Sequence, residues 1–323
     1  MFFRLCSIAG IVSLSLLALA QESVPPAAPD VPSSSASSPE TSASTPATST
    51  PSIKLEPDAS GAVPPEQIRT LLLQAEKKDL ENDKRLRDYT YTQRQEEHRL
   101  DPNGNVVKIE TRTSEMLVIY GEPVEKLVAK NDQPLSAGDA KKEDDKIQKI
   151  IDRRKNESDD DRRKRLEKEE KRREEDRKFV LEIADAFNFR LVGSEVIDGH
   201  DTWILEAEPR PGYEPKQREA KMLSKFKGRV WIDKAEAQWV KLDVTAIDNI
   251  SFGVFLARIY KGAHVVVETT RVNDEVWLPK HVQFRLDAKL VMVKTFREDI
   301  EQTFRDYKKF RTESKITVVG ENQ

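Results

Sequence analysis

The amino-acid sequence predicts an α+β protein: a large curved antiparallel sheet, an open half-barrel covered by helices, with a long charged helical insertion. Three observations predict this class. Residues 228–247 have the pattern of two strands joined by a short polar turn, and from Val240 to Ala246 apolar side chains alternate with polar ones. Similar strand–turn–strand units recur along most of the chain. The segment just before residues 228–247 is helical and highly charged, so the sheet resumes there after an insertion.

The N-terminus has the pattern of a secretory signal peptide over residues 1–20. One positive charge precedes an apolar run that ends at Ala18-Leu19-Ala20, which places small residues where a signal peptidase reads them. An uncleaved anchor is the alternative, but the run is shorter than the roughly 20 residues that a spanning helix needs. We therefore expect cleavage before Gln21.

Cysteine usage bears on the compartment. Cys6 is the only cysteine and lies inside the predicted signal peptide, and residue 21 is Gln, so lipoprotein-type cleavage has no substrate here. The mature chain would lack disulfides, thiolate zinc sites and cysteine nucleophiles. Export without disulfides predicts a soluble protein of a bacterial periplasm.

Composition divides the rest of the chain. Residues 21–65 consist largely of Pro, Ser, Thr and Ala, which cannot bury enough apolar surface to offset their ordering entropy, and we predict a disordered linker. The folded domain is predicted over residues 66–319. The net charge of −3 with 34% charged residues indicates a nearly balanced surface, which does not call for a nucleic-acid partner.

The first half of the domain predicts one helix and a meander. Pro64-Pro65-Glu66 opens a helix, and its apolar stripe needs a surface to dock on. Strands follow over residues 89–100, 106–120 and 124–129. Asn103-Gly104 forms the first turn because this pair accepts positive φ at low cost.

Residues 139–178 form the charged insertion. Lys and Arg nearly balance Asp and Glu, and pairs such as Glu167 with Lys171 have the spacing of an exposed helix. A break is expected near residues 156–161. The basic clusters could favour phosphate binding, but the interleaved acids cancel most of the field, so a solvated helix is preferred.

The second half predicts further hairpins. An apolar helix face over residues 179–189 returns the chain to the sheet, and strands 191–197 and 202–207 flank the turn Asp198-Gly199. A short helix or bend is expected over 220–225. Strands follow over 254–260, 264–272 and 295–319. The clearest one-faced strand has apolar residues at every even position: Val282, Phe284, Leu286, Ala288, Leu290 and Met292.

No catalytic motif is present. The four histidines lack metal-ligand spacing, so neither a metal site nor a cofactor is predicted. Asp198, His200 and Asp201 could form a general acid/base cluster, but their spacing is also that of a hairpin turn, which we favour. Asp233 occupies a turn-starting position. We expect a protein that is not an enzyme.

The motifs Gly228–Asp233 (GRVWID), Asn273–Pro279 (NDEVWLP) and the closing Tyr307–Arg311 resemble the LolA/LolB-like superfamily of exported lipoprotein-sorting proteins. The resemblance covers roughly residues 66–319. It implies an unclosed β-barrel whose concave face, covered by helices, holds acyl chains. It also implies a set of apolar lining residues: Val240, Leu242, Val244, Phe284, Leu286, Leu290 and Met292 on strands, with Ile68, Leu72 and Phe187 on covering helices.

The expected function is non-catalytic periplasmic binding of lipid or lipoprotein acyl chains. Insertion 139–178 departs from the carrier pattern because it is longer than a lid needs. The alternative is an envelope sensor or interaction module, in which the core is filled and the charged helix binds a partner protein. No nucleic acid is expected in either case, and peripheral contact with a membrane is compatible with both.

Overall fold

The computed structural model describes residues 54–310, except 218, 253–256 and 291–293. The predicted signal peptide, residues 21–53 of the predicted linker and Met292 lie outside the described residues, as does the end of the predicted last strand. The described part begins before the predicted domain start at residue 66. Leu55 and Val63 are buried in the main core, so the last part of the predicted linker packs on the domain.

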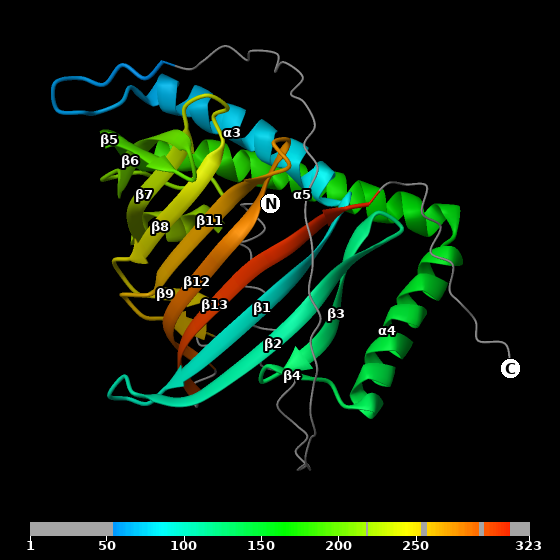
Figure 1. Ribbon diagram of the computed structural model, residues 1–323. Coiled ribbons are helices and arrows are strands. Elements are labelled where there is room, and N and C mark those ends of the chain that lie inside the picture. The colour runs from blue at the N-terminus through cyan, green and yellow to red at the C-terminus, as the bar shows by residue number, and fades with distance from the viewer. Residues whose placement is uncertain (1–53, 218, 253–256, 291–293, 311–323) are drawn as a thin grey trace, which may run out of the picture.

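One antiparallel sheet of 13 strands dominates the described residues and is not closed into a barrel, which confirms the predicted fold class (Figure 1). Its strands lie in the order β4-β3-β2-β1-β13-β12-β11-β8-β7-β6-β5, and the short β9 and β10 extend it beside β12. The bounds are β1 Tyr89–Leu100, β2 Val106–Ile119, β3 Glu122–Lys130, β4 Gln133–Pro134, β5 Phe187–Ile197, β6 His200–Pro209, β7 Phe226–Asp233, β8 Trp239–Ala246, β9 Ile250–Phe252, β10 Ala257–Ile259, β11 His264–Val272, β12 Val276–Leu290 and β13 Lys294–Lys309.

Helices α3 (Pro65–Leu86) and α5 (Asp159–Ala186) pack against each other across one face of the sheet, which we call the helix-side face (Figure 1). The opposite face is the outer face. Asn82 of α3 ties the helix to the sheet, because its side chain accepts the backbone N–H of Trp277 at 3.2 Å and donates to Gln238 at 2.8 Å. The short helix η2 (Glu219–Lys225) matches the bend predicted over 220–225.

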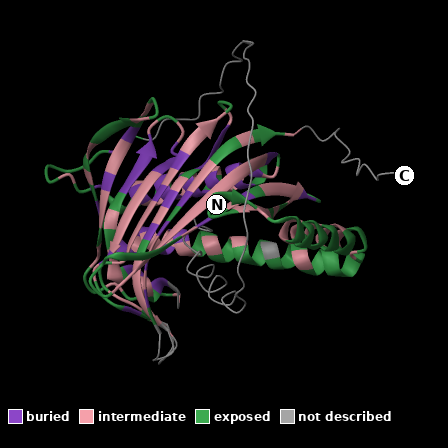
Figure 2. Cartoon of the chain, turned by 60° about the horizontal axis from the view of Figure 1, so that its bottom comes forward, coloured by how far each residue is buried: buried purple, intermediate pink, exposed green. Residues whose placement is uncertain are grey.

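The charged insertion forms two helices, α4 (Ala137–Lys155) and α5, and the chain breaks between them where a break was expected. Ser136 and Ser158 each accept a backbone N–H in the first turn of the helix that follows, at 3.2 Å. Arg154 and Arg165 both pair with Glu122 in the β2–β3 turn and with Glu157. This clamp holds the junction between α4 and α5 against the sheet. Most of the surface of these two helices is exposed (Figure 2).

Both edges of the sheet are covered. At one edge, Gly61 accepts the N–H of Leu191 at 2.8 Å and Val63 donates to Phe189 at 3.0 Å, so the segment before α3 pairs with β5. At the other edge, Glu143 of α4 accepts the N–H of Leu127 in β3 at 3.2 Å. Since an exposed edge is a template for aggregation, these contacts protect the monomer.

The register separates the two faces of the sheet. Leu205, Val230, Leu242, Val267 and Val282 lie opposite one another on successive strands and belong to or pack on the main core under the helices. The adjacent row carries Ile204, Trp231, Lys241 and Glu268 on the outer face. From Leu242 to Ala246, the predicted alternation therefore decides which row is covered.

The hairpin of β7 and β8 depends on a close backbone approach at Gly228. A Cβ atom at this position would lie 2.1 Å from the carbonyl oxygen of Asp243 and 2.7 Å from Cγ1 of Val244. Backbone atoms in a sheet cannot yield by that much without a shift of the strand. Only glycine fits this site.

We expect Gly228→Ala to lower the free energy of unfolding by about 1–3 kcal/mol, since the added methyl group overpacks the hairpin. Urea unfolding followed by circular dichroism measures the change. Gly138→Ala is the matched control, because a Cβ there meets no neighbour within 4 Å and lies in the first turn of α4. Equal stability of Gly228→Ala and wild type would contradict the packing argument.

Candidate functional site

The helix-side face carries an apolar band that runs past the helices. One row of this band joins Val244 of β8, Val265 of β11, Phe284 of β12 and Ile300 of β13. Phe284 and Ile300 are buried, whereas Val244 and Val265 are half-buried. Leu286 continues the band along β12 and is also half-buried. The band thus joins a filled core to partly accessible apolar side chains.

The structure brings most of the predicted lining residues together. Ile68 and Leu72 of α3, Phe187 and Phe284 belong to one buried cluster, and Leu242 packs against it. Phe187 begins β5 rather than lying on a covering helix. Val244 and Leu286 share the helix-side face by strand alternation. The binding role of these residues remains a prediction.

Val240 lies apart from the other predicted residues. The pairing of β7 with β8 shifts between Trp231 and Ile232, and this irregularity turns Val240 out of the phase of Leu242 and Val244. Val240 packs with Trp231 and Trp277 in a separate cluster. Simple alternation could not predict this because one extra residue in a strand reverses the face. Leu290 ends β12, and its side chain is outside the described part, as is Met292.

The helix-side face becomes polar where β13 meets β1. The row through Val267 and Val282 continues as Gln302 and Gln95, whose amides hydrogen-bond at 2.9 Å. Further along, Arg99 has a nitrogen 3.4 Å from Glu97, 3.9 Å from Glu110 and 4.0 Å from Glu298. We call these four residues the charged strip.

The charged strip was not predicted from the sequence. Residues 89–100 carry polar or charged side chains at almost every position, and this lack of an apolar face was the available signal. Together, the apolar band and the charged strip make the helix-side face amphiphilic, with the boundary running along the strands.

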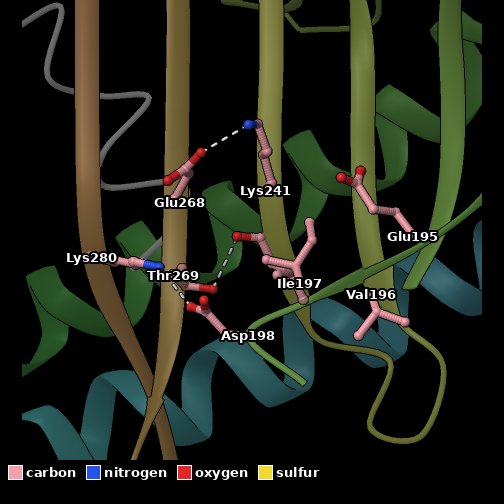
Figure 3. A pocket seen from close by; sticks show the side chains of 9 residues that line it. Glu195, Val196, Ile197, Asp198, Lys241, Glu268, Thr269 and Lys280 are labelled. Carbon is pink, nitrogen blue, oxygen red and sulfur yellow. Dashed lines mark hydrogen bonds and ion pairs between the residues drawn. The ribbon is translucent and has the colours of Figure 1, made fainter. Parts of the chain in front are cut away.

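A pocket of about 220 Å³ lies on the outer face (Figure 3). It is lined by Glu195, Val196, Ile197, Asp198, Val240, Lys241, Glu268, Thr269 and Lys280. Lys241 pairs with Glu268 at 2.8 Å and Lys280 with Asp198 at 2.7 Å. Because each lysine already has a carboxylate partner, the pocket offers little net charge to a ligand. It is polar and does not suit an acyl chain.

Asp198, His200 and Asp201 belong to a tight turn, as predicted, and do not converge on one point. Asp198 and Gly199 have φ of 49° and 84°, the left-handed values of a two-residue hairpin turn. Asp201 pairs with Lys234 at 3.0 Å. The His200 ring instead meets the Trp277 ring edge to face, with ring centroids 4.6 Å apart, and lies 3.4 Å from Asp233.

Asp233 starts the β7–β8 turn as predicted. Its carboxylate accepts the backbone N–H groups of Ala235 at 3.0 Å and of Glu236 at 2.6 Å, which is an Asx-type turn. The side chain is almost fully buried, and burial raises the pKa of the Asp233 carboxyl above its ordinary value of 3.8.

Within the described part of the chain, no three His, Cys, Asp or Glu side chains are grouped so as to hold a metal ion. Among the same residues, no helix has the length and apolar character to cross a membrane.

Comparison with known proteins returns distant structural likenesses. No family model matches the chain, and no curated protein does. Solved structures that match include a DUF1329 family protein from Desulfovibrio piger (TM-score 0.27, 10% identity, covering 76% of this chain and 95% of that one) and a LolA superfamily protein from Nitrosomonas europaea (TM-score 0.27, 8% identity, 76% and 94%). A third is an outer membrane lipoprotein-sorting protein domain from Vibrio parahaemolyticus (TM-score 0.24, 12% identity, 76% and 95%).

Two of these structures carry names of the superfamily that the sequence resembles. The fold described above rests on the strand order and register of this chain itself.

The buried carboxyl of Asp233 predicts a pH dependence. Because the folded state raises its pKa, the folded state binds this proton more tightly than the unfolded chain does. The stabilisation of the folded state by protonated Asp233 is therefore fully present below pH 3.8, and it is lost as pH rises through the pKa of Asp233 in the folded state. Asparagine keeps the oxygen that accepts the two N–H groups but cannot ionise.

We expect the free energy of unfolding of wild type, relative to Asp233→Asn, to fall as pH rises from 4 to 7. Urea titrations at several pH values measure the difference. Asp201→Asn controls for the loss of one negative charge nearby, since Asp201 is 60% exposed. If the free energy of unfolding of wild type, relative to Asp233→Asn, instead rose with pH, the folded state would stabilise the ionised form of Asp233.

Proposed function

We propose that this protein binds acyl chains of lipids or lipoproteins in the periplasm, on the apolar band of its helix-side face, without catalysis. The observation that carries the proposal is the continuity of the filled core with half-buried apolar residues. Leu242, Val244 and Leu286 extend the core in the direction that the sheet continues beyond α3 and α5. An acyl chain laid there would complete their burial.

The proposed binding needs no directional chemistry. Each methylene buried is worth about 0.8 kcal/mol, so a chain of ten methylenes contributes about 8 kcal/mol before the cost of association. The site would discriminate little between acyl chains of different length, because an open face does not limit how far a bound chain extends. Such a site accepts a range of lipids.

The charged strip supports an amphiphilic ligand. Arg99 and its three carboxylate neighbours lie on the same face as the apolar band, on β13, β1 and β2, where the band ends. A polar head placed there would stay hydrated, whereas its chain would lie over β12 and β11. This arrangement favours lipids or acylated proteins over fully apolar molecules.

One observation favours the alternative function, an envelope interaction module. The clamp from Arg154 and Arg165 to Glu122 holds α4 and α5 in a defined position, with an exposed charged surface. In that alternative the core needs no ligand, so the protein would carry no bound lipid. The binding experiment below separates the two functions.

We expect the purified protein to bind a fluorescent fatty-acid probe, and the double variant Val244→Gln/Leu286→Gln to bind it at least about tenfold more weakly, because two apolar contacts are lost. Fluorescence titration gives both dissociation constants. Mass spectrometry of gently purified wild type should also find lipid.

Thr245→Gln is the matched control. Thr245 neighbours Val244 on β8, is half-buried and points to the outer face. Its replacement should leave probe binding unchanged. A wild-type protein that carries no lipid and binds no probe would refute the proposal and favour the interaction module.

A further inference from the structure

The tip of the β1–β2 hairpin exposes three large apolar side chains within four residues. Val106 is 49% exposed, Val107 is 60% exposed and Ile109 is 55% exposed. Burial of these side chains would be favourable, yet the fold leaves them in solvent. We call these three residues the apolar tip.

The apolar tip is held by an ordered turn. The carboxylate of Asp101 accepts the backbone N–H groups of Asn103 at 2.8 Å and of Asn105 at 2.9 Å, and the guanidinium of Arg297 donates to the carbonyl of Pro102. The tip lies at the end of the sheet where β12 passes into β13, away from α3, and reaches past the neighbouring strands (Figure 1). It is therefore a fixed projection.

The pairing of β1 with β2 places two of these apolar groups on one face of the projection. Ile109 lies opposite His98 and Val106 opposite Leu100, and the pairing shifts between Arg99 and Leu100, which leaves Val107 as the extra residue of β2. Because His98 and Leu100 alternate with Arg99 of the charged strip, Val106 and Ile109 lie on the outer face.

The outer face at this end of the sheet carries two basic residues. Arg258 of β10 and Lys289 of β12 lie opposite each other, and neither has an ion pair with any residue in the described ranges. Lys108 lies within the hairpin itself and pairs with Glu110 at 3.2 Å. Basic residues beside an apolar projection are the arrangement that attracts anionic lipid headgroups.

We propose that the apolar tip is a peripheral contact site for an anionic lipid bilayer. Val106, Val107 and Ile109 enter the interface between headgroups and acyl chains, while Arg258 and Lys289 face the phosphate groups. Three aliphatic side chains give a weak and reversible contact rather than an anchor. The site lies on different residues from the acyl-binding band and does not depend on that function.

Vesicle flotation tests the site directly. We expect wild type to float with vesicles of phosphatidylcholine and phosphatidylglycerol, and less with phosphatidylcholine alone. The triple variant Val106→Ser/Val107→Ser/Ile109→Ser should bind the anionic vesicles at least about tenfold more weakly. Arg258→Gln/Lys289→Gln should lose about fivefold per charge, and only on anionic vesicles.

Val196→Ser is the control, because Val196 is 67% exposed on β5, at the opposite edge of the sheet. It should bind vesicles as wild type does. Fatty-acid probe binding by the triple variant should stay at the wild-type level, which distinguishes loss of membrane contact from loss of the acyl-binding band. The proposal would be overturned by a wild-type protein that does not float, or by a triple variant that floats as well as the Val196→Ser variant.

Discussion

The constraint on which this structure depends is the two-residue period of an antiparallel sheet. Strands β6, β7, β8, β11 and β12 place one apolar row on the same face, and that row must be covered. Helices α3 and α5 cover one end of it. Because the sheet is longer than the helices are wide, the apolar band continues as half-buried side chains. The proposed binding face follows from this mismatch.

The covering helices are held by polar contacts as much as by apolar ones. Asn82 joins α3 to β12 and to the β7–β8 turn. Glu182 of α5 is buried and accepts the hydroxyl of Tyr213 at 3.0 Å, and burial raises the pKa of Tyr213 to about 12. Buried polar groups are costly when unpaired, so these contacts admit only one position of each helix on the sheet.

The ends of the sheet differ in chemistry as well as in position. At the end near α3, Tyr89, Tyr91 and Tyr307 pack their rings together, and the hydroxyl of Tyr307 donates to the carbonyl of Pro279 at 2.6 Å. At the other end, the β1–β2 hairpin leaves its apolar tip in solvent. One end is therefore a closed core and the other an accessible surface. A molecule that takes up an acyl chain from a membrane would need the second kind of end.

Local patterns in the sequence were enough to predict most of the secondary structure. Period-two patterns located the main strands, Asp198-Gly199 and Asn103-Gly104 located turns, and the spacing of charged residues predicted a helical insertion with a break near residues 156–161. These signals are local, since each depends on neighbours within a few residues. They also identified Ile68 and Leu72 as buried, because a helical stripe has only one face to cover.

What each face of the sheet contacts depends on how distant strands pair. The irregular pairing at Trp231 turned Val240 away from Leu242, and pairing of β13 with β1 joined the charged strip to the apolar band. Glu97 and Glu298 are distant in sequence, so no local pattern relates them. The edge contacts of Gly61 and Glu143 likewise depend on which strand ends up outermost. Strand order and register are long-range properties, and a one-residue shift in either reverses the face of every side chain.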